Sequence, residues 1–124
     1  MSGGIIAGPG GALAFSSASG GKVYAYNNMS TTPAQVAPAN QSRTQITFHN
    51  PGTIDIFVAP ATSLNASGQA VTLAPNTGAL GGCFRVFANG GTLVINGECQ
   101  TAWQAFTASS SGQPFTVMDS NLNT

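Results

Sequence analysis

The sequence predicts an all-β fold, a single-domain antiparallel β-sandwich of jelly-roll-like type with an extended Gly-rich N-terminal arm. Sixteen glycines and seven prolines punctuate the chain, and ten residues of helical periodicity nowhere run without a turn residue. Short runs of alternating apolar and polar residues stand between these turns, which is typical of a sandwich or barrel. One domain of 124 residues buries roughly two thirds of its unfolded surface, so it needs no metal or disulfide to fold.

Charge is unusually sparse. Charged residues make up 5% of the chain and the formal net charge is zero, whereas roughly 25% is usual for a soluble domain. Such a surface tends to associate, so we expect much of it to be covered by other protein or to consist of Ser, Thr, Asn and Gln. Three scattered cations make no basic footprint, so we expect no nucleic-acid partner.

No membrane partner is expected either, because no apolar run approaches the length of a membrane span. The first positive charge is Lys22, and the apolar pair Ile5 and Ile6 is followed at once by Gly8 and Pro9. This is not the pattern of a secretory signal, so we expect synthesis in a cytoplasm.

The first 21 residues are mostly Gly, Ala and Ser and cannot bury enough apolar surface to fold alone. They form either a loose tail or an arm that orders on a partner. We favour the arm, with residues 22–124 as the sandwich domain, because Ile and Phe are wasteful in a linker. Its apolar anchors are Ile5, Ile6, Leu13 and Phe15.

A first strand is expected at Lys22–Tyr26, with Tyr24 and Tyr26 on one face. The tyrosines are expected either to be half-buried with their hydroxyls in water or to form a contact surface. A polar connection over 27–42 follows, with a short strand around Gln35–Ala37 kept extended by flanking prolines.

Residues 43–58 read as a β-hairpin. Ile46 and Phe48 alternate with polar residues, as do Ile54 and Ile56, and Asn50, Pro51 and Gly52 separate the two runs. A three-residue loop would place Phe48 opposite Ile54 and Ile46 opposite Ile56.

Long loops are expected over 59–69 and 74–82, with a short strand at 70–73 between them. A second hairpin is then predicted over 83–95, where Asn89 and Gly90 suit a type I′ turn. That turn would pair Phe84 with Ile95 and Val86 with Leu93.

Asn96 and Gly97 offer a further turn into a strand over 98–108, and a last hairpin would pair Phe106 with Phe115 and Trp103 with Met118. In such a meander Cys83 and Cys99 lie roughly 9 to 10 Å apart, too far for a disulfide. We expect two small buried hydrophobic residues. A disulfide would become possible only if the strand after Gly97 crosses to the other sheet.

No catalytic pattern is recognisable. His49 alone could act as an acid or base at neutral pH, and its place beside a turn favours a hydrogen bond to backbone. Asp55, Glu98 and Asp119 stand singly, which predicts no glycosidase pair, and the sparse His, Cys and acids predict no metal site. We therefore expect no enzyme and no cofactor.

Arg43 and Arg85 stand out in so neutral a chain. Each could bind a carboxylate of a partner or pair with Asp55 or Glu98 within the fold, and we favour the internal pair. Residues expected at an interface are Ile5, Ile6, Phe15, Tyr24, Tyr26, Arg43 and Arg85. Residues expected in the core are Ile46, Phe48, Ile54, Ile56, Phe84, Val86, Leu93, Ile95, Trp103, Phe106 and Phe115.

Several segments carry a resemblance to a known family: VAPANQSR (Val36–Arg43), ITFHNPG with the following IFVAP, LGGCFRVF, AWQAF and FTVMDSN. From Val36 onward the chain resembles small β-sandwich proteins of tailed bacteriophages that decorate or cement the capsid shell. The resemblance implies a virion structural protein, without catalytic residues, that binds the capsid exterior and clamps neighbouring major capsid subunits. It also implies a homodimer or homotrimer.

The alternative is a head-fibre or tail-fibre binding module that recognises a host surface glycan through its long loops, Trp103 and the tyrosines. Stacking of an aromatic ring on a sugar would require an exposed Trp103. The expected place of Trp103 in a strand beside Phe106 argues for burial instead.

Overall fold

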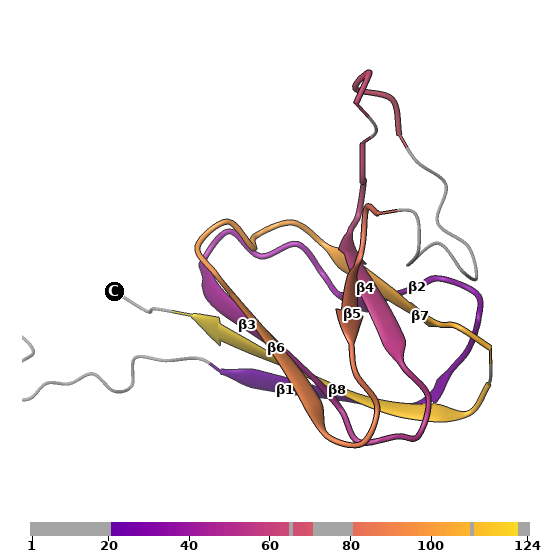
Figure 1. Cartoon of the computed structure of the whole chain (residues 1–124). Helices are drawn as coiled ribbons and strands as arrows, with labels where there is room; N and C mark the ends of the chain where they lie inside the picture. Colours follow the sequence, from indigo (N-terminus) through magenta and orange to yellow (C-terminus); the bar gives the residue numbers. More distant parts are fainter. Residues whose placement is uncertain (1–20, 65, 71–80, 110, 122–124) are drawn as a thin grey trace, which may run out of the picture.

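The computed structural model describes residues 21–64, 66–70, 81–109 and 111–121. They form two antiparallel four-stranded sheets packed face to face (Figure 1), which confirms the predicted all-β sandwich. The strand orders are β1-β8-β3-β6 and β2-β7-β4-β5. The strands are β1 (Lys22–Met29), β2 (Ala34–Ala37), β3 (Arg43–Asn50), β4 (Ile56–Pro60), β5 (Phe84–Val86), β6 (Gly91–Asn96), β7 (Trp103–Thr107) and β8 (Gln113–Asn121).

The pairing of the strands is nested. β1 pairs with β8, β2 with β7, β3 with β6 and β4 with β5. Along the described strands, every connection except the one from β4 to β5 passes from one sheet to the other. This is a long hairpin rolled up into two Greek keys, the arrangement of a jelly roll.

The predicted hairpin over 43–58 is wrong in its pairing. β3 and β4 lie in different sheets, so Phe48 lies opposite Leu93 and Val117, and Ile46 opposite Ile95 and Asp119. Turn residues do separate the strands, but at this turn the chain passes from one sheet to the other. Turn chemistry specifies that the chain reverses, and it does not specify which strand becomes the neighbour.

The other predicted hairpins fail for the same reason. β5 pairs with β4, so Phe84 and Val86 lie opposite Val58 and Ile56, although Asn89 and Gly90 do adopt positive φ angles of 63° and 99°. The strands β7 and β8 likewise lie in different sheets, which separates Trp103 from Met118 and Phe106 from Phe115.

The remaining sequence-predicted elements lie closer to the structure. The strands expected at Lys22–Tyr26 and Gln35–Ala37 are parts of β1 and β2. Of the strand expected at 70–73, Ala70 forms an isolated bridge with Leu64, and residues 71–73 lie outside the described part.

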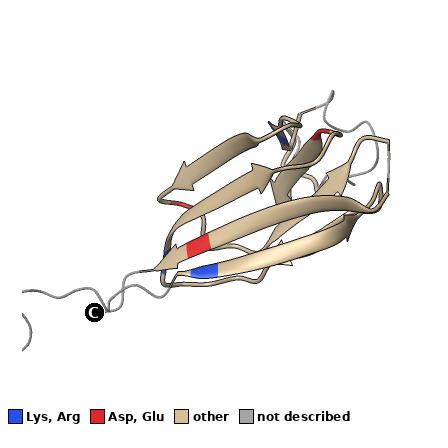
Figure 2. Ribbon diagram, turned by 90° about the horizontal axis from the view of Figure 1, so that it is seen from below, with Lys and Arg blue, Asp and Glu red and all other residues tan. Residues whose placement is uncertain are grey.

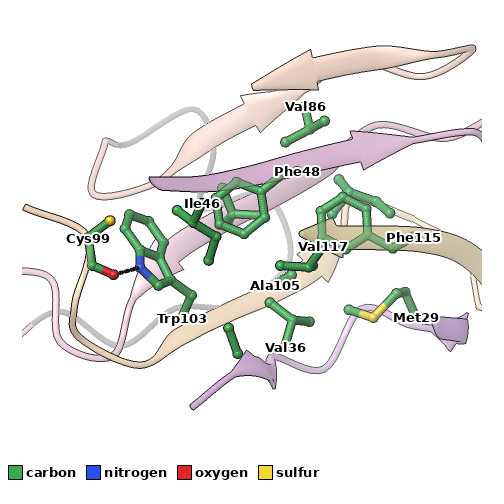
Figure 3. Packing of buried hydrophobic residues seen from close by; sticks show 13 residues of the cluster. Met29, Val36, Ile46, Phe48, Val86, Cys99, Trp103, Ala105, Phe115 and Val117 are labelled. Atoms are coloured by element: carbon green, nitrogen blue, oxygen red, sulfur yellow. Dashed lines mark hydrogen bonds between the residues drawn. The ribbon is translucent and has the colours of Figure 1, made fainter. Parts of the chain in front are cut away.

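The main core fills the space between the sheets (Figure 3). The Phe48 ring lies 5.4 Å from Trp103 and 6.1 Å from Phe115, measured between ring centroids. Ile46, Ile56 and Val86 are also buried there, with the other members Met29, Val36, Ala37, Val58, Cys99, Ala105 and Val117.

A second apolar cluster lies on the other side of the sheet β2-β7-β4-β5. Phe57, Ala59 and Phe106 are buried there, and the Phe57 and Phe106 rings are stacked at 5.6 Å. Since Ile56 and Val58 point into the main core, the intervening Phe57 points outward. The expected core residue Phe106 therefore belongs to this outer cluster.

The core expectation is wrong for Phe84, whose side chain is 49% exposed. Phe84 is the first residue of β5, a three-residue strand at a sheet edge, so few neighbours cover it. Leu93 and Ile95 are partly buried against the core because β6 is also an edge strand, and Ile54 is intermediate in exposure.

Candidate interaction surface

The outer face of the sheet β1-β8-β3-β6 carries exposed apolar side chains on three of its four strands. Ile46 and Phe48 of β3 point into the core, so their neighbours Gln45, Thr47 and His49 point outward. Residues directly opposite one another in an antiparallel sheet project to the same side. The register therefore arranges this face in rows that run across all four strands.

The central row consists of Val23, Met118, Thr47 and Val94, each directly opposite the next. Three of these residues are exposed and apolar: Val23 is 64% exposed, Met118 39% and Val94 46%. The row thus places apolar side chains on both edge strands and on one inner strand. We refer to these four residues as the apolar row.

Uncharged residues, all of them polar except Ala25, flank the apolar row. On one side Ala25, Thr116, His49 and Thr92 follow each other across the strands, and on the other side Ser120, Gln45 and Asn96. His49 Nδ1 lies 3.0 Å from Thr92 Oγ1 and Gln45 donates to Asn96 at 2.7 Å, so the flanking side chains are held to one another. The expectation that His49 bonds to backbone is thus replaced by a bond to a side chain.

No outward-facing position in these three rows carries Asp, Glu, Lys or Arg. Figure 2 shows few charged positions, as blue and red bands on a ribbon whose other described residues are tan. Lys22 and Asp119 lie opposite each other near one end of β1 and β8, and Asp119 is buried. Without charges, the affinity of this face for a partner would depend little on salt.

Tyr24 and Tyr26, which were expected at an interface, do not lie on this outer face. Both pack against the core, on the side of β1 opposite Val23. The Tyr26 hydroxyl donates to the Val36 carbonyl oxygen at 2.6 Å, which links β1 to β2. Burial and the neighbouring Tyr24 raise the pKa of Tyr26. The expectation of a hydroxyl in water is therefore wrong for Tyr26.

Arg43 has no exposed side-chain surface, so it cannot meet a partner in the described fold. Its Nη1 donates to the carbonyls of Cys99 and Thr101, and its Nη2 to the Pro38 carbonyl. Its Nη2 also pairs with Asp119 Oδ2 at 3.1 Å. Arg43 thus links the β2–β3 connection and the β6–β7 connection to β8. Its carboxylate partner is Asp119, not the Asp55 or Glu98 that the sequence suggested.

Arg85 is 52% exposed and pairs with Asp55 at 3.4 Å, as the internal interpretation predicted. Its guanidinium carbon lies 5.4 Å from the centroids of both Phe57 and Phe87. Asp55 also accepts from the Ala88 backbone at 2.8 Å. This cluster lies on the second sheet, away from the apolar row.

The two thiols are free. Cys99 is fully buried in the core, whereas Cys83 is partly buried against the outer apolar cluster. Burial raises the pKa of both thiols. Among the described residues, no three His, Cys, Asp or Glu side chains gather closely enough to hold a metal ion.

A hollow of about 160 Å³ opens at the edge where β2 meets β7. Its polar lining comes from Gln35 and Gln104, and Trp103 reaches it from the core side. Trp103 is only 4% exposed, and its Nε1 donates to the Cys99 carbonyl oxygen at 3.1 Å (Figure 3). The ring therefore offers no face on which a sugar could stack.

Ile5, Ile6 and Phe15, also expected at an interface, lie outside the described residues. The apolar row was missed from the sequence because strand order decides which residues stand side by side. Val23, Met118 and Val94 come from three strands that no local signal connects.

No helix long and apolar enough to cross a membrane occurs in the part of the chain that the structure describes.

Comparison with known proteins identifies no family. No family model matches the chain, and no curated protein does. A chain from a solved structure of Bacillus endospore appendages, described as a novel family of disulfide-linked pili, aligns over 86% of this chain and 88% of its own length. The two are 14% identical with a TM-score of 0.47. A likeness of this size carries no conclusion about function.

Proposed function

We propose that this protein is a virion structural protein that binds the outside of a phage capsid and cements neighbouring major capsid subunits. The observation that carries the proposal is the outer face of the sheet β1-β8-β3-β6, with its apolar row and its uncharged flanks. The resemblance of the sequence to phage decoration proteins supplies the partner. The protein would then reside on the capsid exterior.

The chemistry of this face suits a shell. Exposed apolar side chains gain free energy when a partner covers them, at about 25 cal/mol per Å². Thr, Ser, Gln and Asn can donate and accept hydrogen bonds around that apolar centre, as the rims of interfaces do. A capsid repeats the same docking site many times, which increases retention of an oligomeric cement.

The sandwich also suits a mechanical load. The inner strands β8 and β3 of the proposed docking face are each bonded to a strand on both sides. A pull on this face is therefore shared by the whole sheet. For the N-terminal arm, residues 1–21, we propose contact with a neighbouring subunit of the shell.

Cosedimentation with capsid shells that lack this protein tests the proposal. We expect saturable binding that changes little between low and high salt, and that weakens when residues 1–21 are removed. Met118→Lys places a charge in the centre of the apolar row, on an inner strand, and should weaken binding tenfold or more, about 1.4 kcal/mol.

Leu64→Lys is the matched control. It adds the same charge at a residue that is 60% exposed in the connection between β4 and β5. The control should bind like the unmodified protein. Absence of binding to shells, or equal loss in both variants, would count against the proposal.

A host-glycan binding module is the second candidate, favoured only by the hollow lined by Gln35 and Gln104. Fluorescence of Trp103, the single tryptophan of the chain, separates the two. A buried indole emits at shorter wavelength than an exposed one, and glycans should leave its emission unchanged. Emission typical of exposed indole that shifts with a glycan would favour the module.

A further inference from the structure

The two sheets have four edge strands, namely β1, β6, β2 and β5. An edge strand presents unpaired backbone N–H and C=O groups, and proteins usually protect it with bulges, prolines, charges or short length.

Three of the edges are protected. The pairing of β1 shifts between Tyr26 and Met29, and β1 begins at Lys22. The four residues of β2 stand between Pro33 and Pro38, and its pairing also shifts. β5 is only three residues long and carries Arg85 in its centre.

β6 has none of these features. Its six residues, GTLVIN, include no charge and no proline, and all six pair with β3 without a shift in register. Every second residue of β6 directs its backbone polar groups away from β3, toward the open edge. No described strand pairs with that edge.

The sequence of β6 is complementary to itself. When two copies run antiparallel about Val94, that residue lies opposite its own counterpart, Leu93 lies opposite Ile95, and Thr92 opposite Asn96. Apolar residues then meet apolar residues on both faces, and polar residues meet polar residues. Moving the register by two residues in either direction sets Val94 against Thr92 or Asn96 instead.

We propose that two copies of this chain pair edge to edge through β6, with a two-fold axis at Val94, to form one continuous eight-stranded sheet. Such an interface is isologous, so it uses both β6 edges and closes at a dimer. It requires no charge complementarity, because β6 contains no charged residue.

Two further observations support this partner. Leu93 and Ile95 point toward the core yet are only partly buried, and the second copy would cover both. The apolar row would continue from Val94 across the axis into the row of the second copy.

The first test is the mass of the purified full-length chain by sedimentation equilibrium. We expect about twice the 12.4 kDa of one chain, with a roughly micromolar dissociation constant because a six-residue edge is a small contact. Val94→Lys sets two like charges directly opposite and should raise the dissociation constant at least tenfold. Val23→Lys makes the same change in the apolar row on the other edge strand and should leave the dimer intact.

The register is tested by cross-linking with Cys83 replaced by Ser. In the proposed dimer the two residues at position 94 have Cα atoms about 4.5 to 5.5 Å apart, which is within disulfide range. Val94→Cys should therefore oxidise to a covalent dimer. The two copies of Thr92→Cys would be roughly 13 Å apart along the strand and should not cross-link.

A monomer at all concentrations up to about a hundred times the predicted micromolar constant would overturn the inference. So would a dimer that Val23→Lys disrupts and Val94→Lys does not, or equal cross-linking at positions 92 and 94. A dimer lost on removal of residues 1–21 would mean that the N-terminal arm holds the dimer together, and would overturn the inference as well. None of these outcomes depends on shell binding, so the inference stands or fails separately from the proposed function.

Discussion

Replacing Asp119 by Asn is expected to destabilise the protein far more than any change to the other ion pair. Asp119 Oδ2 accepts from Arg43 Nη2 at 3.1 Å and from Asn40 Nδ2 at 3.3 Å. The side chains of Arg43 and Asp119 are 0% and 1% exposed. Asparagine keeps the size and one oxygen acceptor, so this variant removes the negative charge and turns the second acceptor oxygen into an NH2 donor.

The magnitude follows from burial. Removing one partner of a buried ion pair leaves an uncompensated charge and costs about 3 to 5 kcal/mol. Arg43 retains its bonds to the carbonyls of Pro38, Cys99 and Thr101, which stabilise the remaining cation. We therefore expect the lower end, about 3 kcal/mol, or a fall in Tm of roughly 12 °C for a chain of this size.

The assay is urea unfolding followed by Trp103 fluorescence, because that side chain is buried against the Cys99 carbonyl and becomes exposed on unfolding. Asp55→Asn is the matched control. It removes the same charge from the pair with Arg85, whose side chains are 52% and 30% exposed. An exposed pair contributes about 0 to 1 kcal/mol.

A loss below about 1 kcal/mol for Asp119→Asn, within the range of an exposed pair, would refute this reasoning. An equal loss in the two variants would do the same. The first result would mean that the carbonyl partners of Arg43 alone compensate its charge, and the second that burial does not distinguish the two pairs.

Three further changes test the corners and the thiols. Asn50→Ala removes one amide that donates to two carbonyls and accepts from one backbone N–H, so urea unfolding should report a loss of about 2 to 4 kcal/mol. Gly91→Ala would bring a Cβ into the Phe87 carbonyl oxygen, and thermal unfolding should show a loss of about 1 to 3 kcal/mol. Burial raises the pKa of both thiols, which lowers the thiolate fraction at neutral pH. A thiol reagent should therefore modify Cys83 slowly and Cys99 only on unfolding. Rapid modification of Cys99 in the folded protein would contradict its burial.

The fold class was predictable because the signals for it are local. Alternation of Ile46 and Phe48 with polar residues marks a strand whichever sheet contains it, and Asn89 and Gly90 mark a reversal whatever follows. Burial of Phe48 and Trp103 could be predicted for the same reason. Such residues bury their large apolar surface in any sandwich arrangement.

Pairing was not predictable, because it depends on residues far apart in the chain. The hairpin prediction holds only if strands joined by a short turn pair with each other. In this fold they do not pair, because the Asn50 side chain donates to the Ile54 and Val86 carbonyls and holds the chain where it crosses to the other sheet. In the sequence, Asn50 beside Pro51 and Gly52 indicates only that the chain turns, and not that it crosses to the other sheet.

The interaction surface depends on the same missing information. Val94 and Val23 are separated by most of the chain and are joined in one row only through Met118 and Thr47. Arg43 shows that the sequence can mark a residue as important without showing where it acts. Its rarity in a neutral chain marked it as important, but only the fold shows that it serves the interior.

The nested pairing has a consequence for how the protein is made. Lys22 lies opposite Asp119, so β1, the first described strand, cannot pair until β8, the last, has been synthesised. β8 also occupies an inner position between β1 and β3. A ribosome releases β8 after every other described strand. Until then β1 and β3 lack the neighbour that joins them, and their apolar side chains stay exposed to other nascent chains. Because long-range pairing folds slowly, the rate of synthesis and the capture of this open intermediate by chaperones should control the yield of folded protein.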